Sequence, residues 1–312
     1  MQPLVGTAKL NKLLTQFSQR YTNKNYIATQ ILPKLMVKEK TGNYAKYGTE
    51  NLRVYAGQLY RAPGAPSVTV DYSVSQGEYL CRERSLKKFV PVEAMKNTDQ
   101  PYDPKRDAVQ TLMDIIYNNM EYALATYMGN TANITQNVTL SGGDQWDDYT
   151  NSTPLDDIET AISDIVNATG QRPNTCWMGF ETFRKLKAHP DVREQVKYTN
   201  GGQLSDSAFV AFLKEFFMLN EVFVGTAIYD SADEGQTASL TQVWGKNFWL
   251  GYKNASPTLM QATMGYTFFD EDVMVEEWAE NDPKGEWERV HASWDQNVMD
   301  ASLIYLIKDA VS

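Results

Sequence analysis

The residues that could carry out catalysis in this chain are few. They are two histidines, His189 and His291, and two cysteines, Cys81 and Cys176. Neither histidine lies in a motif that supplies a nucleophile for it to activate, so we expect both to be structural. Two histidines without metal-ligand spacing do not predict a zinc site, and two cysteines do not form a disulfide framework. The sequence therefore predicts buried, reduced thiols and no catalytic residue, metal or cofactor.

The densest group of carboxylates lies between Asp270 and Glu288, where nine acidic residues accompany a single basic one, Lys284. A calcium-binding loop would place ligands at alternating positions with a glycine near the middle, and that pattern is missing. Two interpretations remain: a solvated face, or a surface that receives the basic arm or another positive patch of an adjacent subunit. The second interpretation selects Asp270, Asp272, Glu276 and Glu277.

Positive charge is concentrated at the start of the chain. Residues 1–48 contain eight basic residues and one acidic residue, a charge of +7, whereas the whole chain has a net charge of −10. This asymmetry indicates pairing between subunits or contact with nucleic acid, although the molecule as a whole should repel polyanions. We select Lys34, Lys38 and Lys40 as the contacts of this basic segment.

Length and hydropathy restrict the classes of protein to which this chain can belong. A chain of 312 residues exceeds the size that one hydrophobic core usually supports, so we expect two subdomains. The longest clean apolar run, near Leu303 to Ile307, is far too short to cross a membrane. No charged-then-apolar leader follows Met1, so we expect neither secretion nor a membrane partner.

The first fifty residues are predicted to form an arm of short elements rather than part of a core. Apolar residues from Leu10 to Tyr21 follow a weak helical pattern, and Pro33 and Gly42 limit any helix after it.

Residues 51–91 are predicted to form one long two-stranded excursion. Apolar and polar residues alternate from Val68 to Ser75, which is typical of a strand with one apolar face. An isolated two-stranded ribbon is marginal in water, and the charged second strand suits a partner's polar surface better than a private core. We therefore predict that this hairpin lies on a neighbouring subunit, with these contacts: Arg61, Val68, Val70, Tyr72 and Val74.

The clearest helix is predicted over residues 104–128. Asp103 is a good N-cap, Pro104 suits the first helical position, and Gly129 is a plausible C-cap. A second amphipathic helix starts at Pro154. From there to residue 252 helices interleave with short strands, among them residues 174–179 and 248–252, and Pro190 is predicted to break the helical pattern. This alternation indicates a compact α/β lobe. Residues 258–307 are mostly predicted strand.

The order of these elements resembles the major capsid proteins of tailed bacteriophages of the Hong Kong 97 (HK97) type. Local phrases agree: "YIATQILPKLMVKEKTGNYAKYG" before the hairpin, "YRAPGAPSVTVDYSVSQGEYLC" within it, "FETFRKLKAHPDVREQVKY" in the lobe and "DASLIYLI" at the end. The resemblance implies an α+β, HK97-like fold with a spine helix. Its implied parts are an N-terminal arm (1–50), an extended loop or E-loop (51–91), a peripheral P-domain (92–145 and 262–300) and an axial A-domain (146–261 and 301–312).

What the resemblance implies about function is a structural shell subunit. It would form the pentamers and hexamers of an icosahedral virion head that encloses double-stranded DNA without sequence-specific binding, assembled in the host cytoplasm. A long charged helical N-terminal region is missing, so we expect a separate scaffolding protein or prior cleavage, besides portal and decoration proteins. We identify no lysine and asparagine pair for covalent crosslinking. The alternatives are a non-viral, encapsulin-like nanocompartment shell and, from another class, a soluble α/β enzyme, which lacks a catalytic constellation here.

Overall fold

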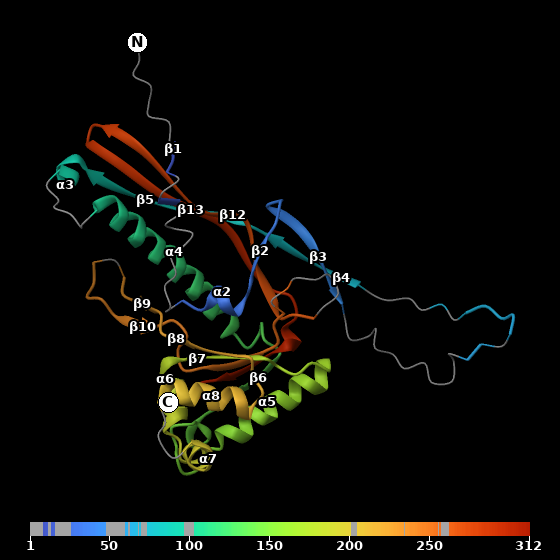
Figure 1. The fold of residues 1–312 in the computed structure, drawn as a ribbon. Coiled ribbons are helices and arrows are strands. Elements are labelled where there is room, and N and C mark those ends of the chain that lie inside the picture. Colours follow the sequence, from blue (N-terminus) through green and yellow to red (C-terminus); the bar gives the residue numbers. More distant parts are fainter. Residues whose placement is uncertain are drawn as a thin grey trace.

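The computed structural model describes residues 9–11, 14–15, 26–47, 60–61, 63–67, 69, 74–96, 103–200, 205–233, 235–254, 256 and 262–312. Two sheets organise the chain. A long twisted sheet with one long helix beside it forms one end, a second sheet with shorter helices forms the other, and a narrow hairpin leaves the side of the molecule (Figure 1). The mixed architecture confirms the predicted α+β class.

The long helix α4 (Pro104–Met128) has the limits that the sequence predicts. The Asp103 side chain accepts hydrogen bonds from the backbone N–H groups of Lys105 and Arg106, and thereby caps the helix. A buried stripe along α4 includes Leu112, Ile116, Leu124 and Met128. These side chains pack α4 against both sheets, because they belong to one hydrophobic core that also contains residues of both sheets.

The first sheet is built around the long antiparallel pair β12 (Gly265–Asn281) and β13 (Lys284–Val298). β5 (Arg82–Pro91) pairs antiparallel with β13 and continues into the short helix α3 (Val92–Lys96). On the other side, β12 pairs antiparallel with β1 (Lys9–Leu10) and parallel with β2 (Lys34–Met36). The N-terminal segment therefore adds two short strands to the sheet of its own chain.

The second sheet has the order β6 (Gln136–Thr139), β14 (Ile304–Lys308), β11 (Phe248–Gly251), β7 (Thr175–Gly179) and β8 (Glu221–Gly225). β6 lies upstream of residue 146, where the sequence places the start of the axial part, yet it pairs with β14 in this sheet. Around this sheet the structure describes the helices α5 (Pro154–Thr169), α6 (Phe180–Ala188), α7 (Pro190–Asn200) and α8 (Asp206–Phe216). It also describes the two-stranded pair β9 (Ile228–Asp230) and β10 (Leu240–Gln242), and the 3-10 turns η2 (Gly142–Asp144) and η3 (Ala301–Leu303).

Both faces of the second sheet are buried, because successive side chains of a strand point to opposite faces. Trp177 and Trp249 belong to the core that contains α4, whereas Cys176 and Phe248, their neighbours in β7 and β11, belong to the core under the lobe helices. The predicted buried, reduced cysteines are confirmed, since both thiols are free and buried. Among the described residues, no helix combines the length and apolar composition needed to cross a bilayer.

Three expectations about elements were wrong. The first fifty residues are not outside the core: Ile27, Ile31 and Leu32, in and beside α2 (Ala28–Ile31), are fully buried against α4. Helix α7 was not expected after Pro190, because proline was read as a break although it also fits the first turn of a helix.

The third correction concerns the predicted excursion over residues 51–91. β4 (Val74–Leu80) pairs with β3 (Thr41–Tyr47), which precedes the predicted range, and β5 lies in the first sheet of the same chain. The alternation pattern identified strands but could not show which strands pair, because pairing partners are set by contacts distant in sequence.

Candidate functional site

The hairpin β3–β4 extends away from both sheets, and the described residues of the loop that joins its strands lie farther out still (Figure 1). Tyr60 in this loop is 91% exposed, and Arg61 beside it is also exposed. Tyrosine and arginine are enriched in protein interfaces, because each combines a large contact area with hydrogen-bonding groups. The loop therefore offers a contact surface beyond the body of its own subunit. Val68, Val70 and Tyr72 lie outside the described residues, and Val74 is the first residue of β4.

The base of the hairpin is attached firmly to its own chain. The rings of Tyr44 in β3 and Tyr79 in β4 stack on Phe268 in β12, with centroid distances of 5.7 and 4.6 Å. The Asn297 side chain also donates a hydrogen bond to the backbone oxygen of Glu78, and the Leu80 N–H donates to Asp295. The ribbon is thus anchored at its base while its loop is exposed.

The basic residues predicted as contacts divide into two kinds. Lys34 forms an ion pair of 2.5 Å with Asp272 of the same chain, and its ammonium lies 4.5 Å from the centre of the Phe269 ring. Lys38 and Lys40 are exposed and form no ion pair with another described residue. Lys34 therefore attaches the arm to β12, whereas the other two remain available to another molecule.

The acidic residues predicted as contacts are largely occupied within the chain. Asp272 pairs with Lys34, Glu276 with Arg289 across the β12–β13 pair, and Glu277 accepts a hydrogen bond from Asn11. Asp270 is half-buried at the Cys81 side of the sheet. Changing these carboxylates would alter the fold of the subunit as well as any contact between subunits.

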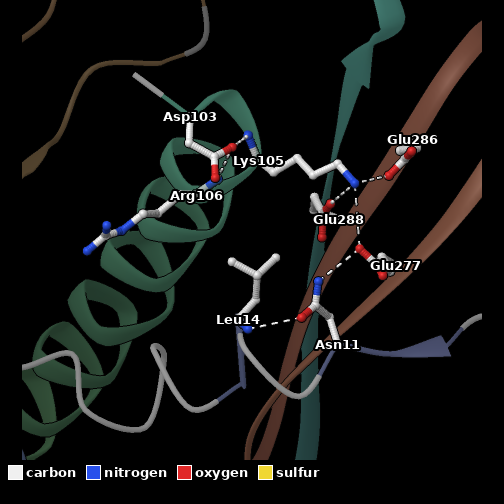
Figure 2. A network of polar contacts seen from close by, with 8 residues as sticks. All are labelled: Asn11, Leu14, Asp103, Lys105, Arg106, Glu277, Glu286 and Glu288. Atoms are coloured by element: carbon white, nitrogen blue, oxygen red, sulfur yellow. Dashed lines mark hydrogen bonds and ion pairs between the residues drawn. The ribbon is translucent and has the colours of Figure 1, made fainter. Parts of the chain in front are cut away.

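Three carboxylates converge on one ammonium group beside the first turn of α4 (Figure 2). The Lys105 Nζ forms an ion pair with Glu286 and lies 3.7 Å from Glu277 and 4.0 Å from Glu288. Glu288 is 0% exposed, and neither of its carboxylate oxygens accepts a hydrogen bond from the described residues. Burial raises the pKa of Glu288 to about 7, with nearby Lys105 opposing the shift and the neighbouring carboxylates adding to it.

No sequence pattern pointed to this cluster beyond the general acidity of residues 270–288. Lys105 is far from these carboxylates in the sequence. It reaches them because it lies in the first turn of α4, and α4 packs along β13 in the folded chain. Glu121 was also missed, although it occurs on the buried stripe of α4, where a charged residue is unusual.

The structure brings a serine, a histidine and an aspartate together at His189. Its Nε2 lies 3.2 Å from Ser152 Oγ, and its Nδ1 accepts the backbone N–H of Asp191 at 3.3 Å. With Nδ1 accepting, the proton of the neutral ring is on Nε2, which donates to Ser152, while the serine hydroxyl itself donates to the backbone oxygen of Asp148. A general base would need the opposite tautomer. Burial also lowers the pKa of His189, and these bonds are those of a structural histidine.

Comparisons with known proteins agree with one another. The family model described as phage major capsid protein E matches residues 108–293, more than half of the chain. The major capsid protein of Burkholderia phage BcepMu is 28% identical over 254 residues, which cover 78% of this chain and 76% of the relative. The major capsid protein of Pseudomonas phage JBD67 is 29% identical over 259 residues, 81% of each chain.

Solved structures extend the comparison to the whole fold. A phage-related protein from Bordetella bronchiseptica RB50 has a TM-score of 0.76 at 27% identity, covering 97% of this chain and 98% of its own. The capsid of cyanophage P-SCSP1u has a TM-score of 0.58 at 11% identity, covering 92% and 89%, which is a likeness of fold.

Proposed function

The chain belongs to the phage major capsid protein E family and has the HK97-type fold, and on that premise we propose that its hairpin and basic arm join subunits into pentamers and hexamers of an icosahedral head. As a structural major capsid protein, it forms the shell of the virion by assembling with copies of itself.

One observation carries the proposal: the hairpin β3–β4 is anchored by Tyr44 and Tyr79 at its base, but its loop displays Tyr60 and Arg61 away from its own subunit. An ordered ribbon loses roughly 1–2 kcal/mol of backbone entropy per residue, which contacts must offset. A second copy of this chain supplies those contacts in the proposal, because a major capsid protein assembles with copies of itself.

The exposed Lys38 and Lys40 support a second contact of the same kind. They lie between β2 and β3, where the arm passes from the sheet to the hairpin, so they share the side of the molecule from which the hairpin leaves (Figure 1). A chain with 39 acidic and 29 basic residues offers negative surface to them on any neighbour.

Family membership supports proposals about the finer features of the assembly. We propose that the shell encloses double-stranded DNA without reading its sequence, because the net charge of −10 does not favour a tight DNA complex. Separate scaffolding, portal and decoration proteins and assembly in the host cytoplasm complete the proposal. We propose the domain limits expected from the sequence with three changes: residues 41–47 and 74–80 form the hairpin, residues 82–91 belong to the first sheet, and residues 136–139 join the axial sheet.

The test is assembly of the purified full-length chain, followed by gel filtration and negative-stain microscopy. We expect the wild type to form megadalton shells, and the double variant Tyr60→Ser, Arg61→Glu to remain as small oligomers with an unchanged melting temperature. Leu240→Ser is the matched control, because Leu240 is a large exposed residue on β10, away from the hairpin. Shell formation by the double variant at the wild-type rate would contradict the role of the loop.

A further inference from the structure

The cluster around Glu288 is two charges short of neutral. Glu277, Glu286 and Glu288 carry three negative charges when ionised, and Lys105 supplies one positive charge. Glu277 and Glu288 stand directly opposite each other across the β12–β13 pair, and Glu286 is a diagonal neighbour on the same face. Like charges at such positions repel one another, and a bound cation would relieve that repulsion.

Glu288 provides independent evidence for a missing partner. Its side chain is 0% exposed, its carboxylate oxygens accept no hydrogen bond from the described residues, and the nearest ammonium is 4.0 Å from Oε1. A buried ionised carboxylate is costly unless it is hydrogen-bonded, paired at close range or bound to a metal. Figure 2 shows this carboxylate between Lys105 and Glu277, on the side where the three acids meet.

We infer that Glu277, Glu286 and Glu288 form a binding site for one calcium ion. One oxygen of each carboxylate lies within 4.8 Å of the others. For three atoms no farther apart than that, one point lies within about 2.8 Å of all of them, close to calcium–oxygen distances of about 2.3–2.6 Å. Calcium accepts oxygen ligands in irregular geometry, whereas magnesium demands a smaller octahedral site.

The ion would take the place of the Lys105 ammonium, whose long side chain is partly exposed, and would leave the three carboxylates with a single uncompensated charge instead of two. It would also join the two strands of the β12–β13 pair, because both strands supply ligands. Asn11 in the N-terminal segment donates to Glu277 and so contacts the same site. The inference concerns one subunit and does not depend on how subunits assemble.

The experiment is titration of the metal-free, full-length protein with calcium chloride and, separately, magnesium chloride, by calorimetry and thermal unfolding. We expect one calcium per chain, at least tenfold tighter than magnesium, and a rise in melting temperature. Glu286→Gln should weaken calcium binding at least tenfold. Asp282→Asn is the matched control, because it removes the same charge from the exposed turn between β12 and β13 and should leave binding unchanged.

A second variant separates a metal site from an ordinary ion-pair network. Lys105→Met removes the competing ammonium, so the metal-free variant should melt at a lower temperature and regain the loss when calcium is added. Calcium should bind it more tightly than it binds the wild type. The inference is overturned if calcium gives no binding heat, if magnesium binds as tightly, or if Asp282→Asn weakens binding as much as Glu286→Gln. Should Lys105→Met fail to fold, the Glu286→Gln comparison decides alone.

Discussion

Glu121 is a buried carboxylate that joins three parts of the chain. It lies on α4, is 1% exposed, and accepts hydrogen bonds from the backbone N–H of Ala28 and from Trp244 Nε1, the latter at 2.6 Å. Ala28 belongs to the N-terminal segment, and Trp244 precedes β11 in the second sheet. Burial raises the pKa of Glu121 to about 7, although both hydrogen bonds favour the charged form and oppose the shift.

The raised pKa of Glu121 predicts how the free energy of unfolding depends on pH. The ordinary pKa of 4.5 applies to the unfolded chain, so the native state keeps the proton to higher pH than the unfolded state does. The stabilisation is therefore fully present below the unfolded-state pKa and is lost as the pH rises through about 7. Relative to Glu121→Gln, the wild type should lose about 3 kcal/mol of unfolding free energy between about pH 4.5 and pH 8.

Urea unfolding of the unassembled subunit at several pH values measures this difference. Glu159→Gln is the control, since Glu159 is exposed on α5 and should give a difference that does not vary with pH. A flat difference for Glu121→Gln as well would show that the buried carboxylate does not titrate in this range.

At the scale of elements, the hairpin base depends on two tyrosine and glycine pairs. Tyr79 stands opposite Gly42, and Tyr44 opposite Gly77, across the β3–β4 ladder. A Cβ atom on Gly77 would lie 2.4 Å from Tyr44 Cζ, and one on Gly42 would lie 2.5 Å from the Tyr79 oxygen. Each ring therefore lies over the opposite glycine, and from there both rings reach Phe268.

Gly77→Val should move the Tyr44 ring and loosen the base by about 1–3 kcal/mol, the usual cost of overpacking. Amide hydrogen exchange in β3 and β4 should accelerate by roughly fivefold to a hundredfold, while α4 is unaffected. Gln76→Val places the same side chain on the exposed face of the same strand and serves as the control. Equal exchange rates in the two variants would show that the packing of the Tyr44 ring does not depend on Gly77.

At the scale of the whole molecule, charge distribution separates folding from assembly. Lys34 and Arg289 pair with carboxylates of their own chain, whereas Lys38 and Lys40 are exposed without such partners among the described residues. Exposed charges act mainly on the rate and register of association, and salt screens them.

Lys38→Glu combined with Lys40→Glu should therefore slow shell assembly at low salt, and light scattering gives the rate. The corresponding double change to Gln should slow it less, because it removes attraction without adding repulsion. Both differences should shrink as salt increases towards about 1 M. The free energy of unfolding should change by less than about 0.5 kcal/mol, as for most surface substitutions. An effect of equal size at all salt concentrations would contradict an electrostatic contact.

Local patterns in the sequence were enough to predict several elements with their limits. Asp103, Pro104 and Gly129 bracket α4, and the apolar segments at β7, β11 and β14 were identified as strands. The family resemblance, which depends on the order of these elements, was confirmed by the family model and by the relatives. Periodicity and capping are properties of neighbouring residues, so they can be read without knowing the fold.

Tertiary structure alone decided which segments meet. It placed Ile31 and Leu32 in the core, assigned β5 to the partner strand β13 rather than to the hairpin, and brought Lys105 to Glu286 and Glu288. Contacts of this kind join residues that are far apart in the sequence. Leu80 and Asp295, for example, form a hydrogen bond although 215 positions separate them. A strand pattern specifies an apolar face and a length, but its partner is selected by the summed burial and hydrogen bonding of the whole chain, which no local stretch of sequence contains.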